Sequence, residues 1–146
     1  MGTRSTIAME QPDGRVMMIY CHWDGYLDHN GKILQNCYKD RAKVLALMLL
    51  GDISSLRGEI GEAHDFDQRY TDQDPREQWC TAYGRDRGES GTEARVFKDF
   101  EDYKANHQYE EYEYCFRLDD QWYVSKYSRA YERLAQALAE EETLEG

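Results

Sequence analysis

Apolar and polar positions alternate at the start of the chain and again near its end. Thr3–Glu10 alternates and carries β-branched residues, Pro12-Asp13-Gly14 is a strong turn sequence, and Arg15–Trp23 is rich in apolar and aromatic residues. Proline presets φ and glycine accepts a positive φ, so this stretch predicts a β-hairpin. Tyr112–Leu118 and Trp122–Lys126 flank a two-aspartate turn and predict a second hairpin.

Helical spacing of apolar residues marks the segments between and after these hairpins. The predicted helices are Lys32–Tyr38, Arg41–Leu50, Glu93–Asn106 and a last helix that starts near Ser128 and carries Tyr131, Leu134 and Leu138. Asp40 is placed to cap the second helix, and Gly51 is placed to end it. Trp79–Tyr83 predicts a short strand, whereas Glu62–Gln78 is polar and acidic and predicts a long surface loop.

This order of elements predicts an α+β fold. We expect a mostly antiparallel sheet, built from two hairpins plus a short strand, with the helices packed on one face. A length of 146 residues fits one domain, and no repeat or linker divides the chain. Residues 1–146 are therefore predicted to form a single domain, with residues 140–146 as a frayed tail.

The net charge of the chain limits the kinds of molecule that it is expected to bind. The net charge is −11, and residues 51–146 alone hold 24 acidic against 12 basic residues. Duplex DNA binding through a basic face is excluded, because phosphate contacts need Lys and Arg, whereas a basic protein surface would be attracted. No signal peptide and no membrane-spanning run is found, so the sequence predicts a cytoplasmic protein without membrane contact. The four scattered cysteines predict free thiols rather than disulfides or a zinc site.

The segment His22–Gly31 concentrates polar and aromatic residues directly after a predicted strand. Its candidate site residues are His22, Trp23, Asp24, Tyr26, His29 and Asn30. The aromatic rings could stack on a ligand, the histidines and aspartates could act as acid and base, or His22, Asp24 and His29 could hold a metal ion. The competing interpretation is scaffold, in which the rings belong to the core and Asn30 caps the next helix.

A second polar loop, Tyr83–Glu89, places Arg85 and Arg87 around an aspartate between glycines. Two guanidinium groups could hold a phosphate or carboxylate in bidentate fashion, beside Tyr83. The loop lacks the spacing of a P-loop. The alternative is a solvated turn whose charges pair with one another.

Four stretches, in this order along residues 1–90, resemble a family of small bacteriophage and prophage proteins. They are Thr3-Arg4-Ser5, Tyr20–Tyr26, Gly51–Leu56 and Arg85–Gly88. The resemblance implies a cytoplasmic accessory protein made in an infected bacterial host. Small acidic phage proteins are a class that often antagonises host defence by blocking a nuclease, a CRISPR complex or a signalling nucleotide. The family supplies no catalytic residues to carry over.

Three functions follow from these observations. The first is a non-enzymatic phage protein that binds and inhibits a host factor, in an anti-CRISPR or similar anti-immunity role, with no cofactor. The second is a binder or sponge of a small phosphorylated nucleotide, which requires the two polar loops to meet in one pocket. The third is a small metal-assisted or acid-base enzyme that uses the loop at residues 22–30.

Overall fold

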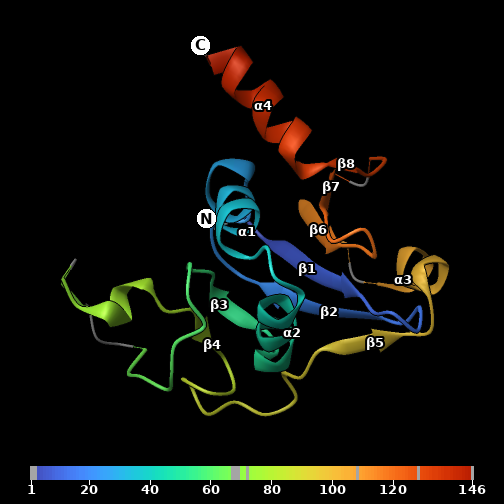
Figure 1. The fold of residues 1–146 in the computed structure, drawn as a ribbon. Helices are drawn as coiled ribbons and strands as arrows, with labels where there is room; N and C mark the ends of the chain where they lie inside the picture. Colours follow the sequence, from blue (N-terminus) through green and yellow to red (C-terminus); the bar gives the residue numbers. More distant parts are fainter. Residues whose placement is uncertain (1–2, 67–69, 72, 108, 128, 146) are drawn as a thin grey trace.

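The computed structural model describes residues 3–66, 70–71, 73–107, 109–127 and 129–145 (Figure 1). Its strands are β1 (Ser5–Glu10), β2 (Val16–Cys21), β3 (Ile53–Ser55), β4 (Thr81–Ala82), β5 (Arg95–Phe97), β6 (Tyr112–Phe116), β7 (Trp122–Lys126) and β8 (Glu132–Arg133). Its helices are the π-helix η1 (Leu27–Gly31), α1 (Lys32–Cys37), α2 (Arg41–Leu50), the 3-10 helix η2 (Pro75–Gln78), α3 (Phe100–Asn106) and α4 (Leu134–Glu145). Within these residues, no helix has the length and apolar character needed to cross a membrane.

All eight strands belong to one mixed sheet, in the order β4-β3-β2-β1-β6-β7-β8, with β5 paired to β2 outside this path. Both predicted hairpins are confirmed, because β1 pairs with β2 and β6 pairs with β7 in antiparallel register. The predicted mostly antiparallel sheet is wrong, since β1 pairs with β6 and β2 pairs with β3 in parallel. Alternation along the sequence marks a strand but says nothing about the direction of its neighbours.

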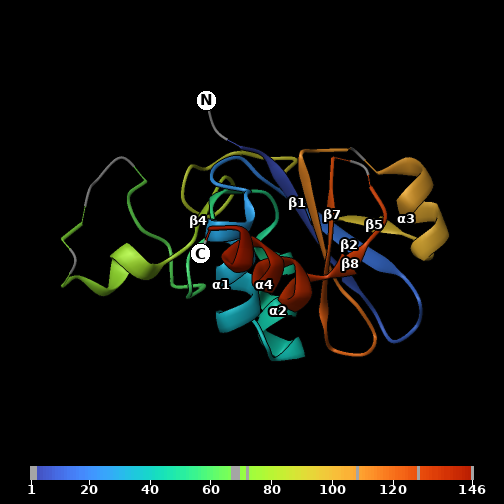
Figure 2. The same ribbon diagram turned by 90° about the horizontal axis from the view of Figure 1, so that it is seen from above.

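Helices pack on both faces of the sheet, which corrects the expectation of a single covered face. α1, α2 and α4 bury Leu34, Leu47 and Leu134 in the larger core cluster, together with Ile7 of β1. α3 lies across the sheet from them and buries Tyr103 in a second cluster, which includes the strand residues Ala8, Met18 and Cys115. Figure 2 shows α3 well separated from the group formed by α1, α2 and α4. Successive residues of a strand point to opposite faces of the sheet, so Ile7 packs in the larger core cluster and Ala8 in the second cluster.

Helix α2 forms where the sequence predicts it. The Asp40 carboxylate accepts a hydrogen bond from the Ala42 N–H at 3.2 Å, and Gly51 ends the helix with φ at 77°. A residue other than glycine would be strained there. The added Cβ would also lie 2.2 Å from the carbonyl oxygen of Thr92.

The helix predicted for residues 93–106 divides into β5 and α3. Val96 pairs with Met17 at the edge of β2 and is 56% exposed, so its apolar side chain belongs to a strand rather than a helical stripe. Asp99 then starts α3 by accepting a hydrogen bond from the Asp102 N–H at 2.8 Å. The capping residue Asp99 marks the boundary between the strand and the helix, which the spacing of apolar residues does not reveal.

The C-terminal helix differs from its prediction at both ends. α4 runs to Glu145, so most of the segment expected to fray is helical. Ser128, the expected cap, lies outside the described residues. Tyr131 precedes the helix and packs with the α3 cluster instead of lying on a helical stripe.

A long excursion connects β3 to β4. We call residues 57–79 the arm, and the described part of the arm stands out from the sheet in both ribbon views. At its base, the Glu59 N–H donates to the Gln78 carbonyl at 3.0 Å and the Cys80 N–H donates to the Glu59 carbonyl at 2.9 Å. These bonds tie the two ends of the arm together beside the edge strand.

Candidate functional site: a pocket formed by the arm

A buried carboxylate fixes the arm against the loop that follows β4. Asp86 is fully buried and accepts hydrogen bonds from the N–H groups of His64 at 3.1 Å and Ala82 at 2.7 Å. Arg85 contributes its Nε to the same carboxylate at 3.0 Å and its Nη2 at 3.1 Å. The Arg85 guanidinium also donates to the backbone carbonyls of Ile60, Gly61 and Cys80. This network positions His64 beside the sheet edge and occupies the Arg85 side chain internally.

The described part of the arm encloses a pocket of about 730 Å³ with strands β3 and β4, and we call it the arm pocket. It is lined by Ser54, Ser55, Arg57, His64, Asp65, Phe66, Tyr70, Arg76, Glu77, Trp79, Thr81 and Arg87. Three of these residues are arginines and three carry aromatic rings, while the strands supply hydroxyl groups. Such a volume and such a mixture of rings and polar groups are typical of small-molecule sites.

The three arginines differ in how much of their charge is used internally. Arg76 pairs with Asp74 at 2.6 Å and lies over the Tyr70 ring, 4.2 Å from its centroid. Arg87 pairs with Glu89 at 3.2 Å, and its guanidinium lies 4.9 Å from the centroid of the Phe66 ring. Among the described residues, the guanidinium of Arg57 has no carboxylate partner. Arg57 is therefore the cation of the pocket with the most unused hydrogen-bonding capacity.

The backbone of Arg57 is nevertheless held firmly. Its N–H donates to the Cys80 sulfur at 3.3 Å, and its carbonyl accepts from the Tyr38 hydroxyl at 2.7 Å. Both partners are buried, and burial raises the pKa of Tyr38 well above its usual range, so the hydroxyl stays a donor. The backbone of Arg57 is thus fixed, while its guanidinium has no carboxylate partner among the described residues and can bind an anion.

His64 lies in the wall of the arm pocket with one ring nitrogen fixed. Its Nδ1 donates to the Glu62 carbonyl at 2.8 Å and lies 3.5 Å from the Asp86 carboxylate. The Trp79 ring packs edge-on against the imidazole, with centroids 5.6 Å apart. No described residue forms a hydrogen bond with Nε2.

The His22–Gly31 segment supports the fold through its backbone and through Asn30. Asn30 is fully buried and donates to the Ser5 hydroxyl at 3.2 Å and to the Cys21 sulfur at 3.3 Å. The buried Tyr114 hydroxyl donates to the Gly25 carbonyl at 2.6 Å. A Cβ on Gly25 would lie 2.8 Å from the Ser5 Cβ, so glycine is required for this close approach.

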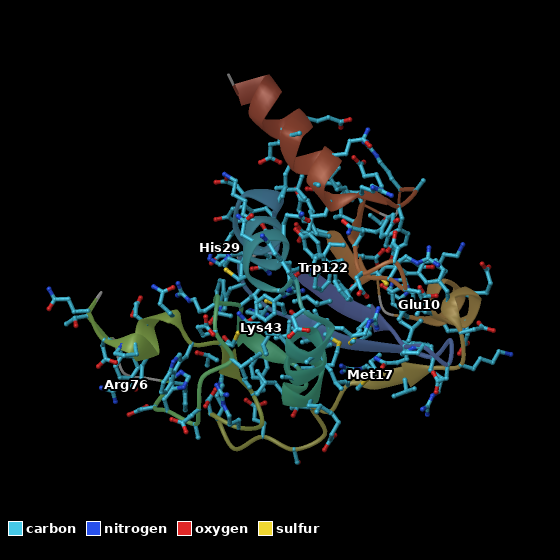
Figure 3. The ribbon with its side chains drawn as sticks, in the orientation of Figure 1. Glu10, Met17, His29, Lys43, Arg76 and Trp122 are labelled. Carbon is cyan, nitrogen blue, oxygen red and sulfur yellow. The ribbon has the colours of Figure 1, made fainter. Side chains whose placement is uncertain are left out.

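The remaining residues predicted in this segment lie outside the arm pocket. Trp23 and Tyr26 are 44% and 39% exposed, Asp24 has a positive φ of 58°, and the His29 Nδ1 donates to the amide oxygen of Asn30 at 2.9 Å. In Figure 3, His29 lies beside α1, far from Arg76 on the arm. His22, Asp24 and His29 do not form a metal site, because the described residues contain no group of three or more ligating side chains that could hold an ion.

Tyr83 lies near the other predicted loop, because its hydrogen-bond partner Ser54 accepts a bond from the Trp23 N–H at 3.0 Å. Burial raises the pKa of Tyr83, and a hydrogen bond with Ser54 of β3 opposes the shift. Burial likewise raises the pKa of Tyr20, with a smaller contribution from Tyr83, and the Tyr20 hydroxyl is 2.8 Å from the His22 Nδ1. Arg87 lies 5.0 Å from the Tyr83 ring centroid. Of the nine predicted site residues, Arg87 alone lines the arm pocket.

Sequence reasoning missed most of the arm pocket because it interpreted Glu62–Gln78 as an acidic surface loop. The rings of Phe66, Tyr70 and Trp79 are the signal that could have been used. Aromatic residues spaced along an otherwise polar loop are unusual unless they cover something.

A second pocket, of about 400 Å³, lies between α3 and strands β6 and β7. At its floor the His107 Nδ1 donates to the Tyr103 carbonyl at 2.5 Å, and Nε2 forms a hydrogen bond with the Glu113 carboxylate. Both side chains are almost fully buried. Because both ring nitrogens are already bonded, this histidine is less available for chemistry than His64.

No protein-family model, curated protein or solved structure matches this chain. The fold and the site therefore define its class by themselves: an α+β protein with a mixed sheet and an arginine- and aromatic-lined pocket under an arm at one sheet edge.

Proposed function

We propose that the protein binds a small phosphorylated ligand that carries an aromatic ring, such as a nucleotide, in the arm pocket. The single observation that carries the proposal is the meeting of three arginines and three aromatic rings in one pocket of a chain whose net charge is −11. Arginines lining a pocket in so acidic a protein point to an anionic ligand, because guanidinium groups match phosphate oxygens in geometry as well as charge.

The aromatic residues supply the second half of the recognition. Phe66, Tyr70 and Trp79 of the arm line the pocket together with the hydroxyl-bearing strand residues Ser54 and Thr81. A nucleobase stacked on such a ring is stabilised by about 1–3 kcal/mol, without dependence on its identity. Arg57 would take the phosphate, since its charge is not used within the described protein.

Binding of mononucleotides measured by isothermal titration calorimetry tests this proposal. We expect adenosine monophosphate, or one of the other three mononucleotides, to bind more tightly than adenosine and than ribose 5-phosphate. Adenosine lacks the phosphate group, and ribose 5-phosphate lacks the aromatic base. Binding of all four mononucleotides weaker than about 1 mM would contradict the proposal.

Arg57→Ala localises the binding. A charge-assisted hydrogen bond contributes about 1.5–3 kcal/mol, so the nucleotide Kd should rise at least about tenfold. The matched control is Arg15→Ala, which removes the same charge from an exposed residue at the first hairpin, where Arg15 pairs with Asp13. An equal loss of affinity in both variants would assign the effect to net charge instead of to the pocket.

The resemblance to phage proteins suggests a setting for this activity. A phage protein that sequesters a host nucleotide would antagonise host defence without contacting a host protein, in the cytoplasm of the infected cell. Direct inhibition of a host protein with a basic surface stays a prediction. It is favoured by the acidic character of residues 51–146, which hold 24 acidic and 12 basic residues. Recovery of a host protein at low salt by the Arg57→Ala variant would support that alternative.

A further inference from the structure

We infer that the arm pocket also hydrolyses phosphate esters, with His64 as the general base. This inference rests on the proposed function, because it requires a phosphate group to be held beside His64. It adds an activity to the binding. Four observations on the His64 side chain carry it: a fixed tautomer, a buried carboxylate behind the ring, an Nε2 to which no described residue is hydrogen-bonded, and a place in the pocket wall.

The hydrogen bond to the Glu62 carbonyl fixes the tautomer of His64. A carbonyl oxygen only accepts, so Nδ1 must carry the proton at its distance of 2.8 Å. In the neutral ring, Nε2 is then the nitrogen with the free lone pair. A general base needs this lone pair directed at its proton donor, and no described residue competes for it.

Asp86 gives the imidazole a partner for the charge that it gains on taking up a proton. Its Oδ1 is 3.5 Å from the His64 Nδ1, and its side chain is fully buried. The two backbone N–H donors and Arg85 hold this carboxylate in place. A buried negative charge behind a histidine orients the ring and stabilises the imidazolium, as the third member of a catalytic triad does.

The neighbours of His64 limit its motion. Trp79 and Tyr70 pack edge-on against the ring, with centroid distances of 5.6 and 6.1 Å. His64 shares the pocket wall with Arg57 and Arg87, which would bind the non-bridging oxygens of a phosphate. Guanidinium groups aimed at those oxygens stabilise the charge that develops in the transition state.

The reaction that follows is balanced without a metal or a redox partner. A water molecule attacks phosphorus while His64 Nε2 takes one of its protons. The new P–O bond forms as the bond to the leaving oxygen breaks, and that oxygen departs as an alkoxide or phenoxide. The proton on Nε2 then passes to the leaving oxygen or to solvent, which restores the neutral imidazole.

Release of para-nitrophenolate from para-nitrophenyl phosphate and from bis(para-nitrophenyl) phosphate measures the activity. Both probes combine an aromatic ring with a phosphate. The wild-type chain should release product above the buffer rate from at least one of them. Arg57→Ala should weaken the activity, whereas Arg15→Ala should leave it unchanged.

His64→Asn separates base catalysis from structure. The asparagine amide nitrogen can replace the Nδ1 donor toward the Glu62 carbonyl, but the variant has no group at the Nε2 position. We expect nucleotide affinity to change by less than about threefold, while turnover falls by about a hundredfold or more. In His64→Ala, added imidazole should restore part of the turnover and should not affect the wild type, an outcome that a purely structural histidine would not give.

The outcomes distinguish the two proposals. A wild-type chain that binds nucleotides but hydrolyses neither probe overturns the hydrolytic activity alone and leaves the proposed function standing. Full turnover in His64→Asn would likewise overturn the role of His64. A chain that neither binds nor hydrolyses overturns both proposals together.

Discussion

The His22–Gly31 segment and the arm at residues 57–79 are similar in composition but differ in how far their polar groups are satisfied within the described protein. Both combine histidine, aromatic rings and acidic residues in a stretch without regular hydrophobic spacing. In the first, Asn30 is fully buried and bonded to the core, and the backbone of Gly25 accepts from Tyr114. In the arm, Arg57 and His64 keep hydrogen-bonding groups that no described residue uses.

This difference shows that residue content does not predict which polar groups are satisfied within the fold. A buried polar group is stable when its hydrogen bonds are satisfied, and a satisfied group has nothing left to offer a ligand. Asp86 combines the two situations. Its own hydrogen bonds are satisfied, and it positions His64, whose Nε2 is hydrogen-bonded to no described residue. The variants below separate the two regions by stability and by binding.

The largest effect is expected for Asp86→Ala. Removal of this buried carboxylate leaves the Arg85 guanidinium without its counter-charge and two N–H groups without an acceptor. Breaking a buried ion pair in this way costs roughly 3–5 kcal/mol, so the free energy of unfolding in urea should fall by that amount. Nucleotide affinity should also be lost, because the arm loses its attachment to the loop after β4.

Asp86→Asn serves as the comparison, since it keeps an acceptor oxygen and the side-chain volume. We expect it to restore part of the stability. A variant Asp86→Ala as stable as the wild type would show that the arm is held by other contacts.

We expect the next largest effect for Asn30→Ala. This substitution should lower the stability of the protein without changing its nucleotide affinity. Removal of the Asn30 side chain takes the amide donor away from the buried Ser5 hydroxyl and Cys21 sulfur, which costs about 1–3 kcal/mol in unfolding free energy. Nucleotide affinity measured on the folded variant should match the wild type, because Asn30 does not line the arm pocket. A loss of nucleotide affinity without a loss of stability would indicate that the His22–Gly31 segment contributes to the binding site.

The cysteines provide an independent readout of the same variant. Burial raises the pKa of Cys21 to about 12, so its thiol stays protonated and protected at pH 8, whereas Cys37 is exposed. Ellman's reagent should therefore label Cys37 alone in the native chain. In Asn30→Ala, loss of the amide donor removes a contact that lowers the Cys21 pKa, but the destabilised segment should open more often. We expect the opening to dominate, so that Cys21 is labelled faster, with Cys37 as the internal standard.

Local sequence signals predicted the parts of the fold that depend on local contacts. Both hairpins and α2, with its Asp40 cap and Gly51 end, form where their patterns indicated. The parallel pairing of β1 with β6 joins residues more than a hundred positions apart, and no pattern within either strand encodes it. The division of residues 93–106 was concealed because apolar side chains at an edge strand can match helical spacing by coincidence.

The candidate site was less predictable than the fold. Two arginines in a glycine-rich loop suggested anion binding, and of these two Arg87 lines the arm pocket. The Arg85 guanidinium instead donates to Asp86 and to backbone carbonyls. Arg57 and His64 line the arm pocket only because the base of the arm is held beside β3 and β4. That arrangement depends on Asp86, whose contact with His64 spans 22 positions and leaves no periodic trace in the sequence.

The smallest effect is expected for Trp23→Ala, a test of the stacking role that the sequence assigned to this ring. Trp23 is 44% exposed, and its ring contacts His22 edge-on at a centroid distance of 4.8 Å. Truncation should lower the free energy of unfolding by less than about 1 kcal/mol, since little area is withdrawn from the core. Nucleotide affinity should be unchanged, whereas the matched variant Trp79→Ala should weaken it at least about fivefold, because loss of a stacking ring costs about 1–3 kcal/mol. If Trp23→Ala weakened nucleotide binding as much as Trp79→Ala, the ligand would extend from the arm pocket to the end of β2, and the two regions would form one site.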